Sequence, residues 1–312
     1  MLRFTAILAL GLLAACTPAE PPRPAGTLKL ATWNMEWLSE RCACLPEGGA
    51  KLCEMRDGSF QRAQDVAGMR ALADQLDADI ISFQEVDGPD MAAKVFDPGK
   101  YEIVMTDEED VQRPGFAIRK GIPFRHEADL VELDDKPAAK GCGNRSLRRG
   151  AVVTVDTAGG PVTMLAVHLK SGCFSAKEDA SSNTRTMGAC EDSRRQQDVL
   201  ARWVEQQVDQ GRPFIVAGDF NRRLDLPGDR IWEALTAASA NKISKARELV
   251  VSSCNPKYPE FIDHIVMSAD LGGRIVAGSH DVLEMSAEQL ESMSDHCPVS
   301  VSIRPAGQSE GR

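Results

Sequence analysis

Short apolar runs that end in polar side chains recur along this 312-residue chain and restrict how it can fold. Such runs suit buried β-strands, and a polar residue at the end of one would face a cleft where the strand meets solvent. Because carboxylates and histidines are costly to bury singly, we expect these residues to satisfy one another or to bind a cation. The polar residues beside the runs are Asn34, Glu36, Gln84, Glu85, His168, Lys170, Asp219, Asn221, Asp263, His264, Asp295 and His296.

Strands alternate with a few strong helices in the predicted order of elements. Apolar residues at helical spacing lie between residues 60 and 76, and a capping box at Ser193 and Gln196 predicts a second helix that begins there and ends before Gly211. Strand-rich segments adjoin each other late in the chain, which favours an α/β fold of two packed sheets over a single doubly wound sheet. The predicted strands cover residues 28–33, 79–83, 101–105, 151–155, 162–167, 214–218, 261–267 and 298–303.

The N-terminal segment has the layout of a secretion signal. One basic residue, Arg3, precedes an apolar stretch and small residues that end at Cys16. Residues 1–15 would be removed, and their ending resembles the bacterial lipoprotein signal, in which the new N-terminal cysteine carries lipid; the alternative is an ordinary signal peptide with a chance cysteine. Residues 16–27 would then form a Pro-rich tether. We therefore expect an exported, membrane-tethered lipoprotein that faces the periplasm or the cell exterior.

The rest of the chain is expected to form one domain over residues 28–304 with a flexible tail at 305–312, because no sharp linker, repeat or long low-complexity tract divides it. The formal net charge of −10 argues against a protein that holds long nucleic acid by a basic surface alone. It does not exclude a nuclease, since a local metal ion and a few Arg or Lys side chains can contact phosphate within an acidic protein.

Cysteine is abundant, with eight of the nine cysteines lying beyond the lipidation site. An even number in a secreted chain indicates disulfides. The best single pairing joins Cys173 to Cys190 across a polar loop, whereas Cys297 lies inside an apolar strand and is interpreted as a buried thiol. A zinc site in the insert at residues 41–53 is disfavoured, because its three cysteines lack a matching second pair.

The chain contains six motifs in a fixed order, namely TWNMEW, ISFQEV, VHLKS, VAGDFN, FIDHIV and SDHCPV. Together they resemble the motifs of the endonuclease/exonuclease/phosphatase superfamily, and the resemblance covers about residues 28–303. It implies a DNase I-like, four-layer α/β sandwich of two packed mixed β-sheets flanked by helices. It also implies hydrolysis of phosphate esters with Mg²⁺ as the cofactor and Mn²⁺ or Ca²⁺ as possible substitutes.

The resemblance also implies roles for single positions. Glu85 would be the principal metal ligand, with Asn34 and Asp295 close to the same ion. Asp263 would accept a hydrogen bond from His296 and raise its pKa, so that the imidazole binds phosphate or takes a proton from water.

Three further matched residues would act on water and phosphate. Asp219 would orient or deprotonate the attacking water, and Asn221 would donate to a phosphate oxygen that gains charge in the transition state. His168 would stabilise the phosphate or protonate the leaving oxygen. Whether Asp219 or His296 is the base stays open.

Basic residues beside the implied cleft are candidates for substrate binding. Arg148 and Lys170, with Arg145 and Arg149, would clamp phosphate, and a solvated basic cluster is an equally supported alternative.

Other residues near the motifs receive weaker interpretations. Glu36 is expected beside the metal ligands without binding the ion itself. His264 points to the opposite strand face from Asp263 and is interpreted as structural. The insert at 41–53 and the loop at 171–190 are candidate specificity elements.

Three functions compete on the sequence alone. The favoured one is a divalent-metal-dependent phosphodiester hydrolase that cleaves DNA or RNA outside the cytoplasm. The second is the same chemistry on a phospholipid or a small phosphate ester, and the third is a non-catalytic binding module. No protein partner is predicted; the expected partners are the phosphate-ester substrate and the membrane, through lipid on Cys16.

Overall fold

The computed structural model describes residues 26–39, 64–108, 110, 112–134, 147–246 and 253–307. The predictions for the signal segment, the lipidated cysteine, most of the tether, the insert at 41–53, Arg145 and the end of the tail lie outside these residues. Within the described parts of the chain, no helix is both long enough and apolar enough to cross a bilayer.

Six strands form the first sheet, in the order β11-β12-β1-β2-β4-β3. Their bounds are β1 (Leu28–Leu38), β2 (Ile80–Val86), β3 (Tyr101–Met105), β4 (Arg113–Arg119), β11 (Asp281–Val282) and β12 (Val299–Ile303). β1 is parallel to β2 and antiparallel to β12. β1 and β2 therefore end on the side of the sheet where β12 begins.

The second sheet has the order β5-β6-β7-β8-β10-β9. Its strands are β5 (Phe124–His126), β6 (Ala151–Thr157), β7 (Gly160–His168), β8 (Phe214–Asp219), β9 (Ile243–Lys245) and β10 (Asp263–Ser268). β7 and β8 are parallel, with His168 in register with Asp219, and the antiparallel β10 places Asp263 opposite the same Asp219. The register of these strands thus places His168, Asp219 and Asp263 next to one another at one end of the strands.

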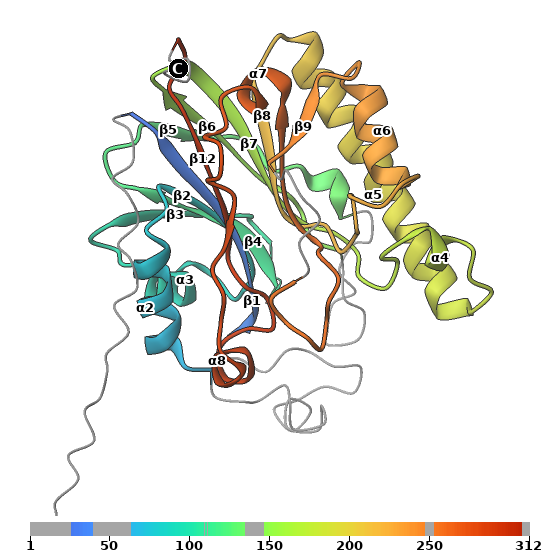
Figure 1. Ribbon diagram of the computed structural model, residues 1–312, viewed down its shortest axis with the longest axis horizontal. Helices are drawn as coiled ribbons and strands as arrows, with labels where there is room; N and C mark the ends of the chain where they lie inside the picture. The colour runs from blue at the N-terminus through green and yellow to red at the C-terminus, as the bar shows by residue number, and fades with distance from the viewer. Residues whose placement is uncertain are drawn as a thin grey trace, which may run out of the picture.

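The two sheets pack face to face, with helices on their outer faces (Figure 1). Alternation along the strands explains the layers: Leu30 and Ile80 lie in the core between the sheets, while their neighbours Ala31 and Ile81 face the helices. The helices are α2 (Val66–Leu76), α3 (Pro89–Val95), the 3₁₀ turn η1 (Val131–Leu133), α4 (Ala176–Asp179), α5 (Thr184–Asp209), α6 (Arg230–Ala238), α7 (Ala269–Gly272) and α8 (Ala287–Ser292).

Each outer layer closes its own apolar core. α2 and α3 contribute to the cluster on the first sheet, and α5 and α6 to the cluster on the second. This arrangement confirms the predicted four-layer sandwich of two mixed sheets. Outside these apolar cores, the ends of the strands can hold polar side chains from both sheets.

The predicted start of the long helix α5 is wrong. The helix begins at Thr184, where the Asn183 side chain accepts from the backbone N–H groups of Arg185 and Thr186. The residues of the supposed capping box lie inside the helix and make tertiary contacts instead. Ser193 Oγ accepts from a guanidinium on α6, and Gln196 Oε1 accepts from the backbone N–H of Lys170.

The cysteine predictions divide into one success and one error. Cys173 and Cys190 form the predicted disulfide. Cys297 is not a free buried thiol, because it is bonded to Cys254. The partner lies 43 positions earlier in a loop without regular structure, so the apolar strand pattern around Cys297 could not reveal it.

Candidate active site

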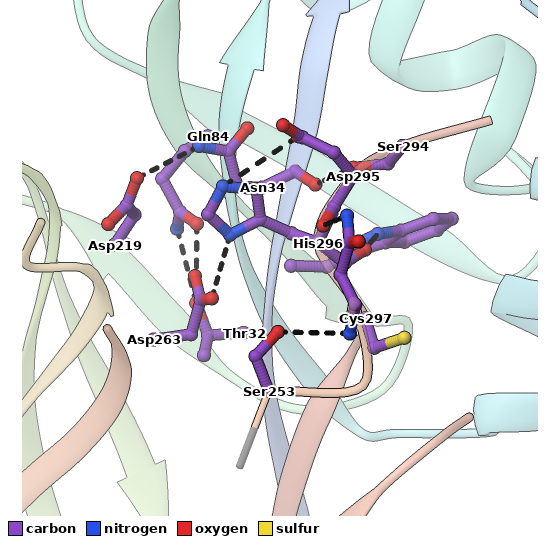
Figure 2. Close-up of polar contacts among 12 residues, drawn as sticks. Thr32, Asn34, Gln84, Asp219, Ser253, Asp263, Ser294, Asp295, His296 and Cys297 are labelled. Carbon is purple, nitrogen blue, oxygen red and sulfur yellow. Dashed lines mark hydrogen bonds and ion pairs between the residues drawn. The ribbon is translucent and has the colours of Figure 1, made fainter. Parts of the chain in front are cut away.

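Polar residues from both sheets converge at one edge of the sandwich, as Figure 2 shows for the residues around His296. Asn34 comes from β1, Asp219 from the last position of β8, and Asp263 from the first position of β10. Asp295 and His296 lie on the turn that precedes β12. The residues are distant in sequence, and the parallel and antiparallel pairings of the strands bring them together.

The backbone is unusual at three positions near the ends of β2 and β8. Glu85 and Asn221 have positive φ angles of 62° and 48°, a region that is costly for residues other than glycine. Gly218 has a φ of 153°, and a Cβ atom there would lie 2.0 Å from the carbonyl oxygen of Val167 on β7. Glycine therefore lets β8 pass close to β7 immediately before Asp219.

Glu85 is held by donors on both carboxylate oxygens. Asn34 Nδ2 donates to Oε1 over 3.1 Å, and Gln112 Nε2 donates to Oε2 over 2.6 Å. His168 Nε2 lies 3.5 Å from Oε1. The carboxylate is therefore fixed in orientation, while no Arg or Lys side chain in the described part of the chain forms an ion pair with it.

Asp219 is a buried carboxylate that links Asn34 to Asn221. Asn34 Nδ2 and Asn221 Nδ2 donate to its Oδ2 over 3.0 and 2.9 Å, and the Asn221 backbone N–H donates to Oδ1 over 2.7 Å. Burial and the nearby charge of Asp263 raise the pKa of Asp219 to about 7, against the opposing effect of His296. The residue can therefore exchange a proton near neutral pH.

His296 is oriented by Asp263. Its Nδ1 lies 2.7 Å from Asp263 Oδ2, and its Nε2 lies 3.8 Å from Asp295 Oδ1. Burial opposes the charged imidazole, but the carboxylates of Asp263, Asp219 and Asp295 together outweigh it, so the pKa of His296 stands well above its ordinary value. This is the pairing that the sequence predicts.

The turn that carries Asp295 and His296 is anchored on several sides. Glu36 Oε2 accepts from the Asp295 backbone N–H over 2.7 Å, which agrees with the supporting position expected for Glu36. Asn255 Nδ2 donates to the Asp295 carbonyl over 2.9 Å. Ser294 Oγ donates to the Asn34 carbonyl over 2.7 Å, which joins the turn to β1.

The predicted metal ligands Asn34, Glu85 and Asp295 lie in the same region, but they are not all in contact with one another. Asn34 meets Glu85 through its amide nitrogen, while its Oδ1 accepts from the Glu36 backbone N–H. In the described residues, no hydrogen bond or ion pair joins Asp295 to Asn34 or Glu85. Asp295 is grouped instead with His296.

The donor set fits a divalent cation. Ligand atoms of Asp219, Asp263 and His296 lie within 4.8 Å of one another. Asp263 Oδ1 is buried and has no hydrogen-bond partner within the described ranges, so it is available to a ligand. Carboxylate oxygens are the ligands that hard cations such as Mg²⁺ prefer. The geometry supports a metal at this cluster or between it and Glu85.

Of the two predicted substrate-binding residues, Arg148 lies at the site. Its buried guanidinium donates to the Leu169 carbonyl over 3.3 Å, and the same carbonyl accepts from Asn221 Nδ2 over 3.1 Å. Lys170 lies farther along the same connection and directs Nζ to the Ser171 carbonyl, 3.0 Å away. Arg149 binds the Asp107 carbonyl.

The family comparison agrees with this geometry. A model of the Endonuclease/Exonuclease/phosphatase family matches residues 31–296. The chain belongs to this family.

Solved structures share the fold at low sequence identity. Truncated TDP2 from Caenorhabditis elegans aligns with a TM-score of 0.55 and 14% identity, over 89% of this chain and 98% of that chain. The AP endonuclease LMAP from Leishmania major gives 0.54 and 16%, over 90% and 89%. A 3'-5' exonuclease from Neisseria meningitidis gives 0.54 and 15%, over 89% and 100%. No curated protein matches the sequence.

Two residues beside the motifs of the Endonuclease/Exonuclease/phosphatase family have structural roles. His264 Nε2 lies 2.9 Å from the Arg222 carbonyl and its ring packs on Phe220 and Phe261, which agrees with the structural role predicted for it. Arg222, which directly follows the VAGDFN motif, is fully buried. Its guanidinium binds the carboxylates of Asp229 and Asp179, together with the Cys173 carbonyl.

Sequence reasoning missed two residues that contact the site, Gln112 and Asn255. Both lie outside the family motifs, in connections between strands where no periodic pattern marks them. Asn255 follows a cysteine that is now seen to be bonded beside His296, so the disulfide would have been the signal. Gln112 had no such signal, because a single glutamine in a loop is ordinary.

Proposed function

We propose that this chain is a divalent-metal-dependent phosphodiester hydrolase that cleaves nucleic acid outside the cytoplasm. One observation carries the proposal: one continuous network of contacts joins residues from the ends of four strands and from the turn before β12, namely Glu85, Asn34, Asp219, Asn221 and the Asp263–His296 pair. Burying these groups together costs free energy that a purely structural core would avoid.

Each residue has a role that follows from its contacts. Glu85 would be the principal ligand of the ion, with Asp295 and Asn34 beside it. A bound divalent cation offsets the charge of the phosphate and polarises the P–O bond. Asp219, a proton acceptor held by two amide groups, would orient and deprotonate water.

The remaining groups would bind the phosphate. His296, held through Nδ1 by Asp263, presents Nε2 to a phosphate oxygen. Asn221 and the buried guanidinium of Arg148 lie on either side of the Leu169 carbonyl and would donate to non-bridging oxygens. His168, between Glu85 and Asp219, would stabilise the leaving oxygen.

Nucleic acid is favoured as the substrate class. The similar structures include an AP endonuclease and a 3'-5' exonuclease, whose names refer to nucleic-acid substrates. A buried arginine beside the candidate phosphate site is consistent with a phosphodiester, because a guanidinium can bind two phosphate oxygens at once.

A substrate panel tests the proposal. Single-stranded DNA, duplex DNA, RNA, phospholipid vesicles and small phosphate diesters are incubated with the protein and Mg²⁺, Mn²⁺ or Ca²⁺. We expect cleavage of at least one nucleic acid that Glu85→Gln and His296→Gln abolish. The matched controls Glu102→Gln and His126→Gln change exposed residues and should retain activity. Hydrolysis of lipid alone would favour the phospholipid alternative, and no hydrolysis with any substrate would favour a binding module.

We also propose export and tethering through lipid on Cys16. The two disulfides are consistent with an oxidising compartment. Radiolabelled palmitate should be incorporated into the wild-type protein and not into Cys16→Ser; equal labelling of the two would refute lipidation at this residue.

A further inference from the structure

Gln64 lies just before α2 and contacts three backbone carbonyl groups at once. Its Nε2 lies 2.8 Å from the carbonyl oxygen of Met35, 2.9 Å from that of Glu36 and 2.8 Å from that of Met293. Because all three neighbours are acceptors, the nitrogen of the amide and not its oxygen must face them, and its two N–H groups are shared among the three. One side chain thus joins the end of β1 to the start of the turn before β12.

The backbone of β1 is not extended where Gln64 binds it. Successive carbonyls of an extended strand point in opposite directions, so one nitrogen could not contact two of them. Glu36 and Trp37 have positive φ angles of 45° and 61°, and the pairing of β1 with β2 shifts its register between Asn34 and Leu38. Positive φ is costly for such residues and persists only where surrounding contacts hold it. Gln64 supplies two of these contacts.

Glu36 connects this bend in β1 to the candidate active site. Its backbone N–H donates to Asn34 Oδ1 over 2.9 Å, and its Oε2 accepts from the Asp295 backbone N–H over 2.7 Å. The bond to Oδ1 leaves Asn34 Nδ2 to donate to Glu85 and Asp219. A shift of Glu36 would therefore move Asn34 and Asp295 relative to each other.

We propose that Gln64 is a positioning residue that fixes the turn before β12 against the end of β1, and so sets Asp295 and His296 relative to Asn34. Its hydrogen bonds go to backbone carbonyls, so it acts through Glu36 and the turn and not on the substrate. A misplacement of about 1 Å caused by a change far from the reacting atoms can lower a rate by about 10²-fold. The inference rests on the proposed function, since it concerns the geometry that the proposed reaction requires.

Amide hydrogen exchange in the metal-free protein tests these contacts without reference to catalysis. The reporters are the backbone N–H groups of Glu36 and Asp295, and kcat and KM are measured separately with Mg²⁺. Gln64→Met removes the donor at nearly constant volume, whereas Gln64→Lys returns N–H donors to the carbonyl groups. The control, Gln207→Met, changes a buried glutamine on α5 that donates to the Trp203 carbonyl.

We expect Gln64→Met to speed exchange at both reporters by ~10-fold or more, because the segments that hold them are no longer joined. kcat should fall by about 10- to 100-fold with little change in KM. Gln64→Lys should recover part of both losses, and Gln207→Met should leave exchange at the reporters and kcat unchanged. If Gln64→Met does not fold, Gln64→Ala provides the same test, because water can then bond the freed carbonyls while the link between them is lost.

The outcomes separate this inference from the proposed function. Unchanged exchange at both reporters in the variant that folds would overturn the inference and leave the proposed function intact. Equal losses of kcat in Gln64→Met and Gln64→Lys would do the same, because the role is assigned to the N–H donor. A wild-type protein that hydrolyses no phosphate ester in the substrate panel would overturn both.

Discussion

The imidazole of His296 and the carboxylate of Asp263 form a close pair, with Nδ1 and Oδ2 2.7 Å apart. Burial alone would lower the pKa of His296, but Asp263, together with Asp219 and Asp295, raises it well above its ordinary value. The pair joins the turn before β12 in the first sheet to β10 in the second. A contact that crosses the two sheets therefore sets the charge and the direction of the imidazole.

Replacing Asp263 with asparagine should release His296. Without the Asp263 carboxylate, the pKa of His296 should fall, because burial is then opposed only by the more weakly acting Asp219 and Asp295. NMR titration of the histidine ring protons in metal-free protein measures this change. We also expect kcat/KM to fall by about 10²- to 10⁴-fold. The exposed Asp270→Asn should change neither quantity, and an unaltered His296 titration in Asp263→Asn would contradict the assigned pairing.

The disulfide between Cys254 and Cys297 should matter more to the site than the one between Cys173 and Cys190. Cys297 follows His296 directly, and Asn255 beside Cys254 binds the Asp295 carbonyl. Removing either disulfide by paired Cys→Ala changes should cost about 2–4 kcal/mol of the free energy of unfolding. Only loss of the first should also shift the His296 titration and lower kcat. Equal effects of both removals on that titration would show that the first disulfide has no special positioning role.

Arg222 should be essential for the stability of the turn that follows β8. Arg222→Met leaves the buried carboxylate of Asp229 without its cation, whereas Asp179 keeps Arg230. We expect a loss of about 3–5 kcal/mol in the free energy of unfolding. Urea denaturation measures it. Arg194 binds the same Asp179 from a more exposed position, and Arg194→Met should cost at most about 1 kcal/mol. Similar losses in the two variants would contradict the role assigned to burial.

Glu108 should make stability depend on pH. Burial raises its pKa to about 7, against hydrogen bonds from Thr106 and the Arg149 backbone N–H. The folded state holds the proton to higher pH than the unfolded chain. The stabilisation is therefore complete below the unfolded pKa of 4.5 and is lost as the pH rises through about 7.

The variant Glu108→Gln should remove this dependence. Its amide can donate to Thr106 Oγ1 and accept from Arg149, so the contacts persist without a charge. Urea unfolding at pH 5 and pH 8 should show the variant gaining about 1–3 kcal/mol over the wild type between the two values. A constant difference between the proteins at both pH values would mean that Glu108 does not titrate in this range.

Sequence predicted the sheets and the meeting of polar strand ends because both follow from local patterns. An apolar run that ends at a polar residue such as Asp219 predicts a buried strand with a polar end, wherever the neighbouring strand lies in the sequence. The order of the six motifs, through the family resemblance, predicted how the strands form two packed sheets. The start of α5 was wrong for the opposite reason. Ser193 and Gln196 fit a capping box locally, but their side chains bond α6 and the segment after β7.

Sequence patterns could not predict contacts between loops that are distant in the sequence. Gln112 and Cys254 act on the site only after the chain has folded, and neither stands in a periodic run. Arg222 follows the VAGDFN motif, but its two carboxylate partners are the last residue of α4, within the loop at 171–190, and the N-cap of α6. The same loop, residues 171–190, stays a candidate specificity element.

The most direct test of the central claim follows the oxygen of the attacking water. A short oligonucleotide is cleaved in H₂¹⁸O with Mg²⁺, and mass spectrometry measures the label in the phosphate of the product. The proposed hydrolysis predicts one ¹⁸O atom for each bond broken, with product absent in EDTA and in Glu85→Gln. Product that forms equally in Glu85→Gln, or that carries no ¹⁸O, would contradict metal-dependent hydrolysis at this site.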